Sequence, residues 1–197
     1  MSNKLKLVAV SGSLNNPSRT TTLLKVIVKE LQQRLPLDVH FIELQDIGPL
    51  LGSSLSRLAL PKQAVDEILK IEEADILAVA TPVYRASVTG LFKHLFDFVG
   101  HETLVNTPVF LAATGGSERH ALVIDHQLRP LFSFFQALTL PLGVYGSEAD
   151  FGDAAPGYSI ESEALNARII LAVERALPYL QALLPVDAPR LSLVNAR

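Results

Sequence analysis

The sequence predicts an α/β protein with a doubly wound, five-stranded, mainly parallel sheet and helices on both of its faces. Apolar runs of strand length alternate with helical patterns from one end of the chain to the other. The strand-like runs are apolar and seldom interrupted, as strands buried on both faces require. The length of 197 residues suits one domain of this kind.

The first predicted elements are a strand, a helix, a second strand and a loop. Residues 5–10 form an uninterrupted apolar run and predict a buried strand. Residues 20–34 carry apolar side chains at the spacing of an amphipathic helix, which Pro36 ends. Residues 39–44 predict the second strand. Residues 48–61 predict a loop that is long enough to serve in binding or assembly.

The middle of the chain repeats the alternation. Residues 62–73 show helical spacing, and the apolar run at 75–80 predicts the third strand. A polar connection leads to a third helix over 91–99. The apolar run at 109–114 predicts the fourth strand.

The last predicted elements are a long apolar helix over 120–138, a fifth strand over 140–145 and a closing helix over 161–184. We therefore expect one domain over residues 1–184 and a C-terminal tail over 185–197. Ligands of doubly wound sheets bind beyond the carboxyl ends of the strands, near the point where strand order reverses. The loops after the first, third and fourth strands are thus the candidate site.

Composition limits the possible partners. Hydrophobic residues make up 49% of the chain and charged residues 19%, and we interpret the apolar surplus as a subunit interface. The net charge of −3 without a basic stretch argues against nucleic acid and anionic membranes as partners. The absence of cysteine means that redox chemistry needs a bound cofactor. With neither a signal peptide nor a membrane span predicted, we expect a cytoplasmic protein.

The loop after the first strand carries groups that bind a phosphate dianion. It combines a helix N-terminus with several hydroxyls and one guanidinium. These groups belong to Ser11, Ser13, Ser18, Arg19 and Thr20. Neither a Walker motif nor a GxGxxG fingerprint is present. The structural alternative is that Ser18 or Thr20 only caps the helix while Gly12 closes a turn.

The loops after the third and fourth strands suit a planar ring. Pro82 stiffens its turn, so that backbone groups near Val83 can be held against a ring edge, and Tyr84 or Arg85 can cover the ring. The other loop contains Thr114, Gly115, Gly116 and Ser117, where the glycines let the main chain approach a ligand. Either loop alone is ordinary turn chemistry, and only the combination of all three loops is specific.

The three loops resemble those of the NAD(P)H-dependent FMN reductase family of flavodoxin-like proteins. The motifs are SGSLNNPSRT at 11–20, TPVYRASVTGLFKHLFD at 81–97 and ATGGS at 113–117. The likeness extends to about Leu184 and is greatest to the reductases of two-component alkanesulfonate or methanesulfonate monooxygenase systems. It implies a flavodoxin-like fold, the cofactors FMN and NADH or NADPH, and a partner monooxygenase that receives reduced FMN.

The resemblance also implies residue roles. It assigns Ser11, Ser13, Ser18, Arg19 and Thr20 to the FMN phosphate. It places Pro82, Val83, Tyr84 and Arg85 beside the isoalloxazine and ribityl chain, and Thr114, Gly115, Gly116 and Ser117 along the pyrimidine side. Hydride passes directly from nicotinamide to flavin in this scheme, so no catalytic side chain and no metal is expected.

The predicted helix over 120–138 is apolar on most of its circumference, which suggests burial by both the sheet and another subunit. Pro130 lacks the N–H that would bond to the carbonyl of His126, so a kink or π-bulge is expected there. Relatives implied by the resemblance form tetramers through this helix. We expect His126 to be a hydrogen-bonded interface residue, and we also consider that the bulge tunes flavin release.

Two alternatives to a flavin-supplying reductase stay open. An electron-transfer flavodoxin is usually strongly acidic and sandwiches the flavin between aromatic side chains, whereas this chain has no Trp and a net charge of −3. A quinone or azo reductase that retains FMN would have a similar phosphate loop. The sequence does not decide between NADH and NADPH.

Overall fold

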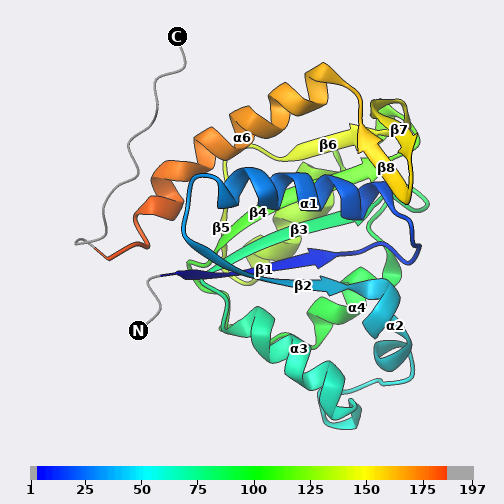
Figure 1. The fold of residues 1–197 in the computed structure, drawn as a ribbon. Helices are drawn as coiled ribbons and strands as arrows, with labels where there is room; N and C mark the ends of the chain where they lie inside the picture. Colours follow the sequence, from blue (N-terminus) through cyan, green and yellow to red (C-terminus); the bar gives the residue numbers. More distant parts are fainter. Residues whose placement is uncertain (1–3, 186–197) are drawn as a thin grey trace.

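A parallel sheet organises the chain in the computed structural model, which describes residues 4–185 (Figure 1). The strand order is β2-β1-β3-β4-β5. Both β5 and β6 pair with β4, β5 with its start and β6 with its end. The strands are β1 (Leu5–Ser11), β2 (Leu37–Glu43), β3 (Ile76–Pro82), β4 (Pro108–Gly115), β5 (Leu138–Thr139) and β6 (Val144–Ser147). Strand order reverses between β1 and β3, so the predicted doubly wound α/β class is confirmed.

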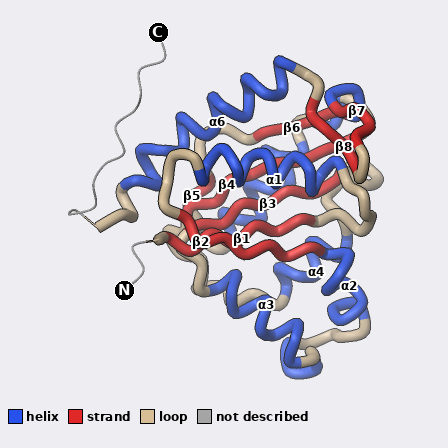
Figure 2. Tube along the Cα trace, in the orientation of Figure 1, coloured by secondary structure: helices blue, strands red, loops and turns tan. Residues whose placement is uncertain are grey.

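Helices cover both faces of the sheet, as Figure 2 shows. Helices α1 (Arg19–Gln32) and α6 (Glu163–Gln181) pack on one face. The other face is covered by α2 (Leu44–Gly52), α3 (Lys62–Glu72), α4 (Gly90–Asp97), the π-helix η3 (Ile124–Leu128) and α5 (Arg129–Phe134). Short 3-10 turns complete the set: η1 (Arg57–Ala59), η2 (Glu118–His120) and η4 (Glu148–Asp150).

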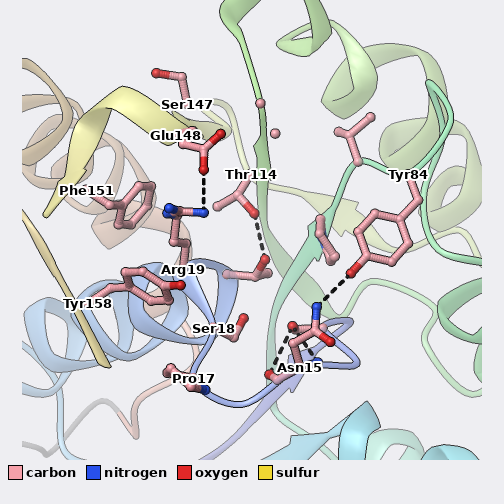
Figure 3. A pocket seen from close by; sticks show the side chains of 16 residues that line it. Asn15, Pro17, Ser18, Arg19, Tyr84, Thr114, Ser147, Glu148, Phe151 and Tyr158 are labelled. Atoms are coloured by element: carbon pink, nitrogen blue, oxygen red, sulfur yellow. Dashed lines mark hydrogen bonds and ion pairs between the residues drawn. The ribbon is translucent and has the colours of Figure 1, made fainter. Parts of the chain in front are cut away.

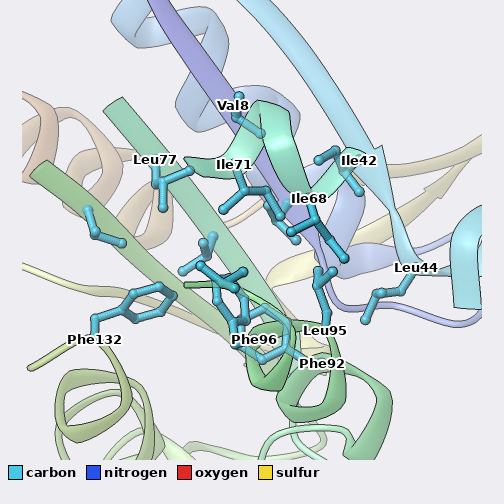
Figure 4. Close-up of a cluster of buried hydrophobic side chains, with 14 of the residues drawn as sticks. Val8, Ile42, Leu44, Ile68, Ile71, Leu77, Phe92, Leu95, Phe96 and Phe132 are labelled. Carbon is cyan, nitrogen blue, oxygen red and sulfur yellow. The ribbon is translucent and has the colours of Figure 1, made fainter. Parts of the chain in front are cut away.

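The side chains of each strand alternate between two cores. Val8 and Val10 of β1 join the core under α2 to α5, whereas Leu7 and Ala9 face α1 and α6. Aromatic side chains fill much of the first core, where the rings of Phe96 and Phe132 lie 4.9 Å apart and nearly perpendicular (Figure 4). Two buried faces explain why the strand sequences are apolar throughout.

The prediction of a loop over residues 48–61 is wrong for residues 48–52, which belong to helix α2 (Leu44–Gly52). Gly48 and Pro49 suggested a break. Leu44, Ile47 and Leu51 nevertheless share one buried face, and this burial outweighs the poor helix propensity of the two residues between them.

The continuous helix predicted over 120–138 is also wrong in extent. The segment forms η2, the π-helix η3 and α5, and its helical part ends at Phe134. The predicted π-bulge is confirmed, since η3 immediately precedes Arg129 and Pro130. His126 and Pro130 are exposed in the single chain.

The C-terminal third contains the other departures. The strand predicted over 140–145 is wrong for most of its length: β5 ends before it at Thr139, β6 begins only at Val144, and Pro141 lies in the connection between them. An antiparallel hairpin, β7 (Phe151–Ala154) and β8 (Gly157–Ile160), forms where no element was predicted. The closing helix runs from Glu163 to Gln181 rather than over 161–184.

The predicted tail over 185–197 lies, apart from Pro185, outside the described residues, and the domain assignment to 1–184 stays a prediction. Within residues 4–185, no helix combines the length and apolarity needed to cross a membrane. In the same range, no three side chains of His, Asp or Glu gather into a possible metal site.

Candidate cofactor site at the carboxyl edge of the sheet

A cavity of about 240 Å³ lies where the loops after β1, β3 and β4 meet (Figure 3). This is the edge of the sheet at which the sequence placed the candidate site. Ten of the predicted residues line the cavity: Ser13, Ser18, Arg19, Thr20, Pro82, Val83, Tyr84, Thr114, Gly115 and Gly116.

The loop after β1 ends in the N-terminus of α1, whose cap is Ser18. The Ser18 hydroxyl accepts a hydrogen bond from the Thr21 N–H at 3.2 Å, so Ser18 does cap the helix, as the structural alternative for this residue stated. Capping leaves the N–H groups at the very start of the helix without carbonyl partners in the helix. Ser13 orders the same loop, because its hydroxyl accepts from the Asn15 N–H at 3.2 Å. Free N–H groups and hydroxyls at one helix end are suited to an anion.

Arg19 supplies the positive charge of the cavity. One of its terminal nitrogens lies 2.9 Å from a carboxylate oxygen of Glu148, and its guanidinium carbon lies 4.6 Å from the centre of the Tyr158 ring. Its Nε is buried and has no hydrogen-bond partner in the described part of the chain. A buried donor without an acceptor is costly, and an anionic ligand oxygen would satisfy it.

The loop after β3 is tied to both neighbouring loops. The Val83 N–H donates to the Thr114 carbonyl at 2.7 Å, and the Tyr84 hydroxyl accepts from the Asn15 amide at 3.3 Å. Tyr84 and Ser87 close a tight turn through paired backbone bonds of 2.9 and 3.2 Å, with Arg85 in the left-handed region at φ 52°. Tyr84 remains 42% exposed, so it forms an open wall of the cavity.

The loop after β4 exposes its main chain. A Cβ at Gly116 would meet no atom within 4 Å, so the backbone there is open. A Cβ at Gly115 would collide with the hydroxyl of Tyr145. That hydroxyl donates to the Ser117 carbonyl at 2.6 Å and thereby fixes the loop. Burial, together with the charges of Asp150 and Glu118, raises the pKa of Tyr145 and keeps its phenol protonated.

Three predicted residues lie outside the cavity lining. Ser11 is buried at the end of β1, where its hydroxyl is 2.8 Å from that of Thr21. Arg85 is exposed in its turn, and Ser117 follows the open backbone at Gly116. Their assigned contacts with a cofactor stay predictions. Thr20 and Thr114 do line the cavity, but their hydroxyls bond to each other at 2.6 Å.

Sequence reasoning missed six lining residues. They are Asn15, Pro17, Ser147, Glu148, Phe151 and Tyr158. Four of the six come from the segment that runs from the end of β6 through β8 and folds back over the start of α1. The Pro156-Gly157 pair between two aromatic residues was the available signal for a hairpin, although its position over the cavity is a tertiary effect.

The fold and the site together define a flavodoxin-like protein with a ligand cavity at the switch point of its sheet. Residues 5–151 match the family model described as NADPH-dependent FMN reductase, and the chain belongs to this family. It is accordingly an oxidoreductase that uses FMN together with NADPH or NADH.

Relatives and solved structures agree with this membership. The chain is 59% identical to the NADH-dependent FMN reductase SfnF of Pseudomonas fluorescens, over 90% of this chain and 93% of that protein. It is 57% identical to the FMN reductase (NADPH) of Pseudomonas aeruginosa, over 90% and 94%. An oxidoreductase structure from Corynebacterium diphtheriae superposes with a TM-score of 0.81 at 33% identity, over 92% of this chain and 99% of that one. The NADH:FMN oxidoreductase EMOB, at 24% identity, shares the fold with a TM-score of 0.76, over 98% and 97%.

Proposed function

We propose that the cavity binds FMN with its phosphate at the start of α1 and its ring against the loops after β3 and β4. The observation that supports the phosphate position is Arg19, which brings a cation and a buried, unpartnered Nε to a helix N-terminus. Ser13 and Ser18 add hydroxyls beside it. This set consists of donors and a positive charge, which is the chemistry that a phosphate dianion requires.

The ring end of the proposed site is formed by Pro82, Val83 and Tyr84 on one side and by Gly115 and Gly116 on the other. Bound FMN would supply the redox chemistry by accepting hydride directly from the nicotinamide, so no protein nucleophile or metal enters the scheme. The chain's own task is positioning. The Val83–Thr114 bond fixes the spacing of two loops, and the open backbone at Gly116 can place N–H groups near a developing negative charge.

One assay separates the proposed site from a merely structural one. Oxidation of NADH and of NADPH is followed at several FMN concentrations, and binding of FMN and of riboflavin is titrated, in the wild type and in Arg19→Gln. Loss of a charge-assisted contact should raise the Kd for FMN roughly tenfold to a hundredfold and leave riboflavin unaffected. Arg34→Gln, just beyond the other end of α1, is the matched control. Equal weakening of FMN and riboflavin binding by Arg19→Gln would refute the phosphate assignment.

We further propose that the reduced flavin leaves for a partner monooxygenase. The sequence resemblance to reductases of sulfonate-utilisation systems supports this role, and the open wall at Tyr84 suits an exchanging ligand. A supplying reductase should elute nearly colourless from gel filtration and saturate with added FMN. Retention of stoichiometric FMN would favour the quinone or azo reductase alternative. A cytoplasmic location belongs to the same proposal.

Assembly into a homo-oligomer, a tetramer in our proposal, would use the outer surface of the π-helix and α5. Phe134, at the end of α5, is 68% exposed, Leu122, two residues before the π-helix, is 61% exposed, and Leu138 of β5 is 40% exposed. Large apolar side chains at such exposure favour burial against another subunit. His126 lies on the same segment. If His126→Ala changes neither FMN affinity nor oligomeric state, the idea that the bulge tunes flavin release is wrong.

A further inference from the structure

A carboxylate faces the cation at the proposed phosphate end of the cavity. Glu148 opens η4, and its side chain points at Arg19 in Figure 3 with the 2.9 Å ion pair drawn between them. The Glu148 side chain is 58% exposed and the Arg19 side chain 34% exposed. A negative charge beside the main cation of an anion site is unexpected, because it repels the ligand that the site would bind.

The position of Glu148 is built into the fold. The preceding residue, Ser147, caps η4, with its N–H and hydroxyl donating to the Asp150 carboxylate at 2.7 and 2.8 Å. Burial alone would raise the pKa of Asp150, but the hydrogen bonds from Ser147 and Ser162 outweigh it and lower this pKa, so the cap holds at neutral pH. The backbone of Glu148 is therefore held between a strand and a capped turn, which brings its carboxylate to the cavity beside Arg19.

Arg19 also has contacts other than Glu148 that place it. Its backbone belongs to the first turn of α1, which Ser18 caps, and its guanidinium lies over the Tyr158 ring at 4.6 Å. Such a cation–π contact orients a guanidinium without neutralising it. The carboxylate is thus an additional partner whose main electrostatic effect is to cancel the charge of Arg19 while the cavity holds no anion.

We propose that Glu148 competes with the flavin phosphate for Arg19 and so keeps the affinity for FMN low enough for the flavin to exchange at each turnover. This inference rests on the phosphate position proposed above. To form its contacts, the phosphate must share or displace the Glu148 carboxylate, and like charges that remain close oppose binding. When the phosphate leaves, the carboxylate replaces it as the partner of Arg19, which stabilises the empty site and favours release.

The test compares Glu148→Gln with the wild type in calorimetric titrations of FMN and riboflavin. Removing the competing charge should tighten FMN binding by roughly 1.5- to fivefold, the range set by a partly exposed ion pair, and leave riboflavin unchanged. The dissociation rate of FMN in stopped flow should fall by a similar factor. Glu102→Gln removes the same charge from the loop before β4, at the opposite edge of the sheet, and should change neither ligand.

The outcomes are distinct. Unchanged or weaker FMN binding in Glu148→Gln, with Arg19→Gln still weakening FMN selectively, would overturn the competition while the phosphate site stands. Weaker binding of FMN alone would show that Glu148 orients Arg19 instead. If Arg19→Gln has no selective effect on FMN, the phosphate site and the competition are both refuted. A thermal melt of Glu148→Gln that matches the wild type ensures that the comparison concerns binding.

Discussion

Replacing Gly12 by alanine tests how packing beneath the first loop shapes the site. A Cβ at this position would lie 2.9 Å from Phe92 Cδ2 and 3.0 Å from Thr81 Oγ1. Phe92 and Thr81 are fully buried, so neither can move without disturbing the core under α4. The backbone of Gly12 lies outside the positive-φ region, so alanine fits the main chain and the effect arises from packing alone.

The magnitude follows from two opposing contributions. Overpacking a buried site costs about 1–3 kcal/mol. Replacing glycine restricts the unfolded chain and returns about 0.4–1 kcal/mol. The net loss is about 1–2 kcal/mol, which lowers the Tm of a protein this size by roughly 2–8 °C. Gly12 also directly precedes Ser13, so a shift that relieves the clash should weaken FMN binding.

Differential scanning calorimetry and FMN titration measure both effects. Gly90→Ala is the matched control, since a Cβ at the start of α4 would meet no atom within 4 Å. Its Tm should stay the same or rise slightly, because alanine is the better helix residue. Equal melting temperatures for Gly12→Ala and the wild type, with unchanged FMN affinity, would refute the packing argument.

Three further predictions concern other contacts. Tyr145→Phe removes the 2.6 Å hydrogen bond to the Ser117 carbonyl, which contributes about 0.5–1.5 kcal/mol. The KM for FMN should rise a few-fold with a smaller change in kcat. An unchanged KM would contradict the role given to this phenol. Arg57→Ala should cost about 1–2 kcal/mol in urea unfolding at neutral pH, since it leaves the buried Glu72 carboxylate without its guanidinium. Burial opposes ionisation of Glu72, but the bonds from Arg57 outweigh it and lower the pKa of Glu72 in the folded state. The stability from this ion pair is therefore present above the unfolded pKa and is lost as pH falls through the folded pKa. The wild type should lose more stability than Arg57→Ala on acidification below about pH 5, and parallel losses would contradict this assignment. Phe134→Asp should shift the oligomer to smaller species in light scattering, whereas an unchanged mass would exclude this surface from the interface.

The elements that sequence predicted well are those with a strong local pattern. Strands β1, β3 and β4 are buried on both faces and therefore carry continuous apolar runs. The π-helix was predictable because Pro130 removes one backbone donor at a known position. Helix α2 was missed because Gly48 and Pro49 interrupt its pattern, and the burial that stabilises it depends on the rest of the fold.

The part of the site that follows from the order of the strands was predictable, and the part that depends on tertiary contacts was not. Three loops could be located because parallel strands bring their carboxyl ends to one edge. Glu148 and Tyr158 were not predictable, since they reach Arg19 from η4 and from the hairpin that follows it, more than 120 residues further along the chain, and no local pattern places that segment over α1. The electrostatic balance of the phosphate end is thus a property of tertiary structure.

A crystal structure of the wild type with FMN tests the central claim most directly. We predict the phosphate within hydrogen-bonding distance of Ser18 and Arg19, and the ring between the loop at Pro82–Tyr84 and the backbone at Gly115 and Gly116. Density for the phosphate away from the start of α1, or for the ring outside these two loops, would contradict the account.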